Sequence, residues 1–207
     1  LSQIFLSIYF FIFKLKSEKK FIKDLYENLN LENLLLTLRQ RKIEITFTSD
    51  YQSKASINFI KTKDPDFLVS HTPYWVGRKV RDLSKEKLVI GSHPGIVPNY
   101  RGAHSAFWSR LNCDKDKNGY SIFCLDHGTD SGPVIKREIV TYNDKVSYKC
   151  NDYLLMKKCS FAHADLVKDY SNGVKIKLNK QLNLHNSQIK KAPGLLDYLK
   201  FQKLMKK

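Results

Sequence analysis

The chain has 207 residues, of which 42% are hydrophobic and 12% aromatic, so it is long and apolar enough for one domain with a substantial core and is not an intrinsically disordered chain. Lys and Arg total 36 against 20 Asp and Glu, a formal charge of +16. A basic surface attracts phosphate, but Lys is spread along the whole sequence, so the charge fits either an anionic partner or a general compositional bias.

The four cysteines are widely spaced and have no neighbouring His/Cys cluster. They are Cys113, Cys124, Cys150 and Cys159. This spacing supports neither a zinc site nor a disulfide framework, and no other metal site is indicated. We therefore expect buried structural thiols in a reduced, cytoplasmic chain.

The N-terminal segment, residues 1–41, is predicted to be helical. Its first part, Ile4 to Phe13, is strongly apolar, but it is too short to span a bilayer and its charges follow it, so a buried or interfacial helix is expected rather than a signal peptide or a membrane span. Helical spacing of apolar residues continues from Phe21 to Leu29 and from Leu31 to Leu38, with Asn30 as a possible N-cap. The chain starts with Leu rather than Met, which suggests a truncated sequence.

A catalytic domain is predicted over residues 42–178. Ile43 to Phe47 is typical of a strand, Ser53 to Ile60 of a helix that ends before a proline, and Phe67 to Ser70 of another strand. Two aromatic residues, Tyr74 and Trp75, follow this last strand. They are either ordinary core aromatics or part of a ligand surface at a strand end.

The pattern is clearest between Leu88 and Gly132. A short β-branched run, Leu88 to Ile90, predicts a buried strand that stops where glycines and prolines begin. Helical spacing then covers Ala103 to Leu111, and Tyr120 to Leu125 alternates as a second strand before another polar loop. A polar loop thus follows each of the two predicted strands.

His93 and Asp130 lie on these two loops. In open α/β sheets the ligand crevice lies outside the carboxyl ends of the strands, so the two side chains are expected to meet there. A carboxylate beside an imidazole stabilises the imidazolium and fixes its tautomer, which suits proton transfer and oxyanion stabilisation. Taken alone, a His beside Pro is more often a simple loop residue.

The rest of the chain predicts a strand, a long helix and a tail. Pro133 to Tyr142 is typical of a strand, Val146 to Tyr170 of a helix with Gly173 at its C-terminal cap, and Val174 to Leu178 of a short last strand. Residues 179–207 are interpreted as a docking tail with one short helix.

Two segments together, HPGIVPNYRG and LDHGTDSGPVI, resemble the folate-dependent formyltransferase family, which includes methionyl-tRNA, glycinamide ribonucleotide and sugar-nucleotide formyltransferases. The resemblance covers about Lys42 to Gly173. It implies that His93 and Asp130 match two of the three catalytic positions of the family. Gly91 stands where the family has Asn, so the resemblance implies a site that lacks one oxyanion donor.

The implied reaction is transfer of a formyl group from 10-formyltetrahydrofolate to an amine, either a nucleotide-linked amino sugar or an aminoacyl-tRNA. The resemblance also implies a folate pocket at Pro73, Tyr74, Leu125 and Asp126. Arg101, beside Tyr100, is expected either to brace its loop or to bind a substrate phosphate.

The fold expected from these observations is α/β and Rossmann-like, with a mainly parallel sheet, helices on both faces, and the first strands of the family missing on the N-terminal side. Two other functions stay open. The missing Asn favours a formyltransferase-like binding protein without activity, and the charge alone would fit a basic RNA-binding module.

Overall fold

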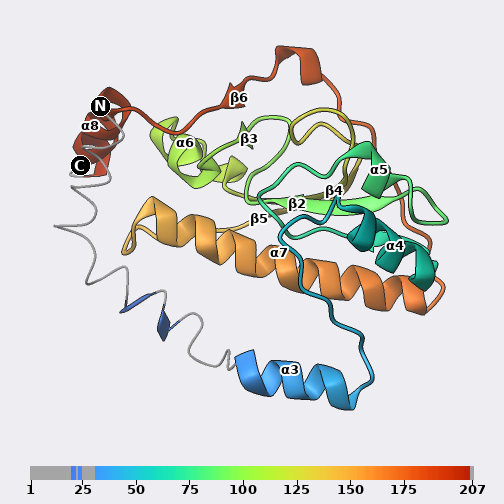
Figure 1. Ribbon diagram of the computed structural model, residues 1–207. Coiled ribbons are helices and arrows are strands. Elements are labelled where there is room, and N and C mark those ends of the chain that lie inside the picture. The colour runs from blue at the N-terminus through green and yellow to red at the C-terminus, as the bar shows by residue number, and fades with distance from the viewer. Residues whose placement is uncertain (1–19, 22, 25–30, 206–207) are drawn as a thin grey trace.

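The computed structural model describes residues 20–21, 23–24 and 31–205 (Figure 1). The helices are α3 (Leu31–Gln40), α4 (Lys54–Lys63), α5 (Arg78–Arg81), α6 (Ser105–Leu111), α7 (Tyr148–Ser171) and α8 (Leu195–Met205), with short 3-10 turns η2 (Lys115–Lys117) and η3 (Leu184–Asn186). The strands are β1 (Leu68–Val69), β2 (Val89–His93), β3 (Arg101–Gly102), β4 (Gly119–Cys124), β5 (Val134–Ile139) and β6 (Ile189–Lys190).

The main sheet has the order β1-β2-β4-β5, and its pairing is mixed rather than mainly parallel. Strands β1 and β2 are parallel, whereas β4 is antiparallel to both β2 and β5. The reason is local: His93, at the end of β2, pairs with Ser121, near the start of β4, so the chain re-enters the sheet at the edge where it left. The architecture is α/β and Rossmann-like, as expected.

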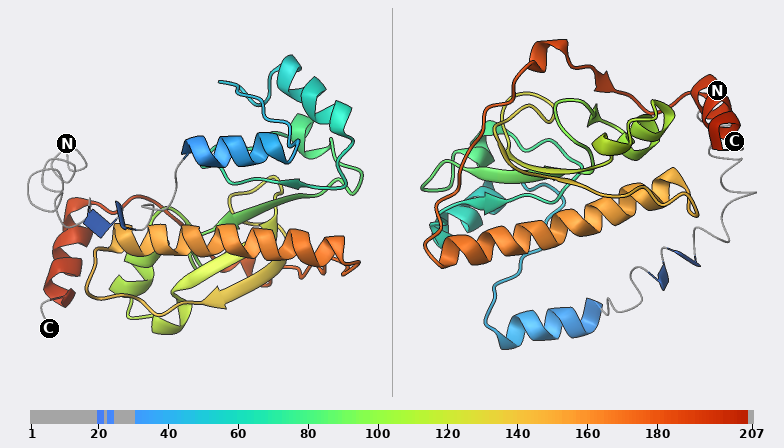
Figure 2. Two further views of the ribbon diagram at one scale, coloured as in Figure 1. Left: turned by 90° about the horizontal axis from the view of Figure 1, so that it is seen from below. Right: turned by 180° about the vertical axis from the view of Figure 1, so that it is seen from behind.

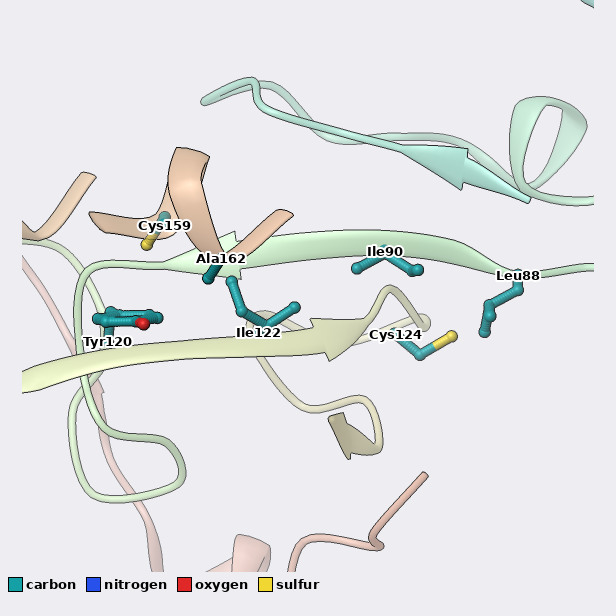
Figure 3. Close-up of a cluster of buried hydrophobic side chains, with 7 residues drawn as sticks. All are labelled: Leu88, Ile90, Tyr120, Ile122, Cys124, Cys159 and Ala162. Carbon is teal, nitrogen blue, oxygen red and sulfur yellow. The ribbon is translucent and has the colours of Figure 1, made fainter. Parts of the chain in front are cut away.

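Helix α7 covers one face of the sheet, along which it runs in both Figure 1 and Figure 2. Alternate residues of β2 and β4 point to this helix and form a buried apolar cluster, whose side chains are drawn in Figure 3. The cluster consists of Leu88, Ile90, Tyr120, Ile122, Cys124, Cys159 and Ala162. Burying each large apolar side chain of this kind contributes about 1.5–3 kcal/mol, so this face anchors the sheet.

The opposite face is packed by loop residues. Val97, from the loop after β2, lies with Phe123 and Val134 in a second buried cluster, and Leu125 packs against it. Because side chains alternate along a strand, Gly91 and His93 belong to this face, opposite α7. The loop that carries the HPGIVPNYRG segment is therefore folded down onto the sheet beside His93.

Helix α8 packs against α6 and α7. Its Tyr198 and Phe201 form a buried cluster with Phe107 of α6 and Tyr148 of α7, and the rings of Phe107 and Phe201 stack with centroids 4.7 Å apart. The division of the chain at residues 41/42 and 178/179 stays a prediction.

Three helix ends show how the sequence sets the local structure. The Ser53 side chain caps α4 by accepting from the Ser56 amide, and the Ser147 side chain caps α7 by accepting from the Cys150 amide. Past the end of α7, Gly173 adopts a φ of 84°, a left-handed conformation that costs glycine little. The helices predicted around Ser53–Ile60 and Val146–Tyr170 are thus confirmed.

Two predicted strands are wrong. Ile43, Ile45 and Phe47 are exposed and their segment pairs with no strand among the described residues. Residues 174–178 form no ladder; only an isolated bridge, between Val134 and Asn179, follows them. An alternating pattern becomes a strand only where a partner supplies hydrogen bonds.

The N-terminal predictions are only partly visible. The helix predicted from Leu31 is confirmed as α3, whereas Ile4 to Phe13 and most of Phe21 to Leu29 lie outside the described residues. Of the residues described between 1 and 41, none is in a strand. No helix in the described part of the chain is long and apolar enough to cross a membrane.

The four cysteines are free, and three of them are buried as expected. Burial raises the pKa of the Cys159 thiol to about 11, which keeps it protonated and unreactive near neutral pH. Cys113 is exposed, so the prediction that all four are buried is wrong for this residue.

Candidate active site

His93 is the last residue of β2 rather than a loop residue. The strand runs on through Gly91 and Ser92, and the exposed fraction of His93 is only 6%. Ser92 points the other way, where its hydroxyl bonds the Cys159 thiol on α7. The strand thus aims His93 at the loops that cover the opposite face.

Both ring nitrogens of His93 have partners. Nδ1 lies 3.5 Å from Asp130 Oδ2. Nε2 lies 2.8 Å from the Tyr100 carbonyl oxygen and 2.8 Å from Ser105 Oγ. The structure therefore brings the two predicted catalytic side chains together and adds two partners from the next segment of chain.

Asp130 is held in place by its backbone and by its carboxylate. Its φ of 49° is left-handed, a conformation that Asp tolerates better than most residues. The Gly102 amide donates to Oδ2 at 2.7 Å, and Gln181 Nε2 donates to the Asp130 carbonyl at 3.0 Å. The carboxylate is thus fixed in the position from which it faces His93.

The route by which the pair meets differs from the one expected. Because β2 and β4 are antiparallel, their carboxyl ends lie at opposite edges of the sheet. Residues 125–133 instead fold back over the sheet face, where the Arg101 guanidinium holds them by donating from Nε to the Thr129 carbonyl at 2.7 Å. The convergence is a property of the loops, not of a shared strand edge.

Arg101 and Tyr100 brace these loops. Arg101 is buried and also donates from Nη1 to Ser187 Oγ at 2.9 Å, which ties the tail segment to the site. The Tyr100 hydroxyl donates to Asp114 at 2.5 Å, and burial together with this carboxylate raises the pKa of the phenol. The bracing role expected for Arg101 fits these contacts, and the phosphate-binding role stays a prediction.

The predicted folate residues lie in two segments joined by Arg81. Pro73 and Tyr74 are exposed, Tyr74 by 72%, in the loop after β1. The buried guanidinium of Arg81 donates to the carbonyls of Val76, at 2.9 Å, and Asp126, at 2.8 Å. The two segments are thus brought together on one side chain.

Several polar groups of the 126–132 loop near Arg81 also have hydrogen-bond partners. Nη2 of Arg81 contacts His127 Nδ1 at 2.9 Å, and the guanidinium lies 5.7 Å from the centre of the Trp75 ring. The Asp126 carboxylate accepts from the Gly128 amide and from Ser131 Oγ, so its hydrogen bonds stabilise the loop itself. The Leu125 amide donates to the Val89 carbonyl at 2.7 Å.

Sequence reasoning missed Ser105, Arg81 and His127. Ser105 follows the recognised segment by three residues and would be found only by asking which polar residue at a helix start faces the core. Arg81 does not lie in a recognisable sequence motif. Its signal is burial, which the sequence does not display.

A cavity of about 480 Å³ opens beside the Arg101 brace. Its walls carry mostly amide and hydroxyl side chains and one lysine: Pro98, Asn99, Leu182, Asn183, Asn186, Ser187, Gln188 and Lys190. Within the described residues, no group of three or more His, Cys, Asp or Glu side chains is placed to hold a metal ion.

Comparison with known proteins bears on this site. No protein-family model matches the chain. Curated relatives are the GDP-perosamine N-formyltransferase of Brucella melitensis, 29% identical over 108 residues (52% of this chain, 40% of the relative), and the methionyl-tRNA formyltransferase of Thermodesulfovibrio yellowstonii, 31% identical over 112 residues (54% and 34%). In sequence, the chain is thus similar to folate-dependent formyltransferases.

Solved structures of formyltransferases are similar to this chain in fold. The formyltransferase PseJ of Anoxybacillus kamchatkensis, solved with tetrahydrofolate, superposes with a TM-score of 0.55 at 22% identity, covering 83% of this chain and 85% of PseJ. A sugar N-formyltransferase from Shewanella gives a TM-score of 0.54 at 15% identity, with coverages of 75% and 65%. The chain spans less than half the length of the curated relatives named above.

Proposed function

We propose that this chain transfers a formyl group from 10-formyltetrahydrofolate to an amine. The observation that carries the proposal is the contact between His93 Nδ1 and Asp130 Oδ2, 3.5 Å apart, built from the two segments that resemble the family. Formyl transfer needs a group that stabilises an oxyanion and moves a proton, and an imidazole beside a fixed carboxylate supplies both.

The proposed reaction balances without any other reactant. The amine nitrogen attacks the formyl carbon and forms a new C–N bond, which gives a tetrahedral oxyanion. Protonated His93 stabilises the oxyanion by a charge-assisted hydrogen bond, and the Asp130 carboxylate stabilises the imidazolium. The bond between the formyl carbon and N10 then breaks, and the proton lost by the amine ends on N10 of tetrahydrofolate.

The folate donor is assigned to the surface between Tyr74 and the 126–132 loop. Trp75 is 53% exposed and Tyr74 72% exposed, so both rings offer apolar surface to a pterin, and Arg81 holds this segment against Asp126. These exposures argue against the alternative that Tyr74 and Trp75 are core aromatics. Pro73, Tyr74, Leu125 and Asp126 remain the proposed folate-binding residues.

The amine substrate is assigned to the cavity beside Arg101. Amide and hydroxyl side chains suit a polar molecule rich in hydroxyl groups. Lys190 on the cavity wall, with Arg101 behind it bonded to Ser187, supplies positive charge for a phosphate. These properties favour an amino sugar linked to a nucleotide over an aminoacyl-tRNA, which is the second substrate to test.

A second candidate function is folate binding without turnover. The observation in its favour is Gly91, which lacks the side chain of the family Asn and lies against Leu125. The third candidate, a basic RNA-binding module, is supported by the net charge alone. The cytoplasmic location stays a prediction.

The test incubates the purified chain with formyl-labelled 10-formyltetrahydrofolate and a panel of amino sugar nucleotides or methionyl-tRNA. Label transfer by the native chain and its loss in Asp130→Asn supports the enzyme. Folate binding without transfer to any acceptor supports the binding protein. Salt-sensitive RNA binding without folate binding supports the third function and contradicts both others.

A further inference from the structure

The Nε2 side of the His93 ring is closed by the protein. The Tyr100 carbonyl oxygen and Ser105 Oγ each lie 2.8 Å from Nε2, and both residues are buried. Gly95 completes the enclosure, because a Cβ atom there would lie 2.6 Å from Nε2 and 2.6 Å from the Tyr100 oxygen. Nothing larger than glycine fits beside this nitrogen without displacing its partners.

These contacts decide which ring nitrogen carries a proton. A carbonyl oxygen can only accept, so a lone pair on Nε2 would face the Tyr100 lone pairs at 2.8 Å, which is repulsive. Nε2 must therefore carry hydrogen. Ser105 Oγ lies 3.3 Å from the same carbonyl and donates to it, which leaves the hydroxyl oxygen free to share the Nε2–H.

The Nδ1 side of the ring is different. Its partner is the Asp130 carboxylate at 3.5 Å, whose Oδ2 already accepts from the Gly102 amide. With Nε2–H fixed, Nδ1 is the ring atom at which His93 gains or loses a proton. A proton there lies between the imidazole and a carboxylate that is held in place.

We propose that Ser105 is a positioning residue that, with the Tyr100 carbonyl, fixes the Nε2–H tautomer of His93 and so confines proton exchange to Nδ1 beside Asp130. The inference rests on the proposed function for its catalytic consequence. In formyl transfer Nδ1–H donates to the oxyanion and then gives its proton to N10 as the bond to the formyl carbon breaks, and the neutral Nδ1 takes up the proton that the amine loses.

The matched control is Ser109, which is on the same helix and equally buried. Its hydroxyl donates to the Ala106 carbonyl at 3.4 Å, so Ser109→Ala removes the same atoms from α6 as Ser105→Ala and leaves the His93 contacts intact. The comparison separates the loss of a buried hydroxyl from the loss of this particular one.

The test is ¹⁵N NMR of histidine-labelled protein over a pH titration, which reads the tautomer of the His93 ring without folate. We expect neutral His93 to carry hydrogen on Nε2 in the native chain and in Ser109→Ala, and a raised Nδ1–H fraction in Ser105→Ala. With an acceptor amine present, kcat falls roughly tenfold in Ser105→Ala at unchanged KM, as is common when an orienting partner is lost, and stays at the native value in Ser109→Ala.

Neutral His93 that carries hydrogen on Nδ1 in the native chain overturns the inference, and this measurement needs no variant to fold. An unchanged tautomer and an unchanged kcat in folded Ser105→Ala overturn the role of Ser105. A native Nε2–H tautomer that shifts in Ser105→Ala, without formyl transfer to any acceptor, supports the positioning role and contradicts only the proposed function.

Discussion

Leu125 lies against Gly91, on the face of the sheet where a side chain at position 91 would project. A Cβ atom at Gly91 would lie 2.5 Å from Leu125 Cδ2 and 3.0 Å from Cγ. Leu125 thus fills the space that the side chain of an Asn at position 91 would need, so a test of the proposed Gly-for-Asn replacement has to change the two positions together.

The first prediction concerns this pair. Gly91→Asn alone forces Leu125 from its packed position and should lower the free energy of unfolding by about 1–3 kcal/mol, which denaturant unfolding measures. In the double variant Gly91→Asn with Leu125→Ala the amide has room. If the oxyanion lacks a donor, formyl transfer should then be on the order of tenfold to a hundredfold faster than in Leu125→Ala. A folded double variant no faster than Leu125→Ala would show that the missing amide does not limit the rate.

The second prediction is that Asp130→Asn lowers the rate of formyl transfer by about 10²-fold or more, with little change in melting temperature. Asn tolerates the left-handed backbone of residue 130 and still accepts from the Gly102 amide, but it does not stabilise an imidazolium. Melting and activity are measured on the same sample. A stable variant with native activity would remove Asp130 from the mechanism.

His93→Ala would be an informative test if His93 lay in an exposed loop, but its position makes the result harder to interpret. The residue is buried, and its removal leaves the Tyr100 carbonyl and Ser105 short of a partner, at a cost of about 1–3 kcal/mol. Loss of activity would thus be mixed with loss of stability, and the effect of Asp130→Asn is easier to interpret.

The third prediction tests Arg81 as the link between the two proposed folate segments. Arg81→Met removes the donors to the Val76 and Asp126 carbonyls and should destabilise the fold by about 2–4 kcal/mol and weaken folate binding. The control is Arg78→Met on the same helix, because Arg78 is 77% exposed and bonds only Asp82 among the described side chains. That change should stay within about 0.5 kcal/mol. Equal effects of the two changes in urea unfolding would contradict the assignment.

The fourth prediction concerns pH. Burial, with the neighbouring His71, lowers the pKa of His163 on α7 below its ordinary value of 6.5, against the opposing effect of a hydrogen bond to the Gly91 backbone. A histidine with a lowered folded pKa is neutral in the fold and takes up a proton on unfolding. Its contribution to stability is therefore complete above pH 6.5 and is lost as the pH falls towards the folded pKa, by at most about 1.4 kcal/mol per pH unit.

The measurement is urea unfolding between pH 7.5 and about pH 5. His163→Gln should flatten the pH dependence in this range, while His185→Gln, at an exposed position, should leave it as in the native chain. A native slope in the His163 variant would mean that other groups cause the dependence.

The sequence alone determined where helices end and which family the chain resembles, and the proposed chemistry rests on that resemblance. Gly173, Ser53 and Ser147 mark helix ends through backbone conformation and side-chain capping, which act over a few residues. Two short segments were enough to indicate the family and to select His93 and Asp130. These features depend on neighbours in the chain, which a sequence displays.

The tertiary structure decided how these parts meet. The Arg101 side chain joins Thr129 and Ser187, 28 and 86 residues away. Together with the bonds from Arg81, Gly102 and Gln181, these contacts hold the 125–133 loop over the sheet towards His93. The antiparallel entry of β4, the exposure of Ile43 to Phe47 and the leucine against Gly91 are of the same kind. Each depends on which distant group comes within hydrogen-bonding or van der Waals distance. The periodicity of apolar residues does not identify that distant group.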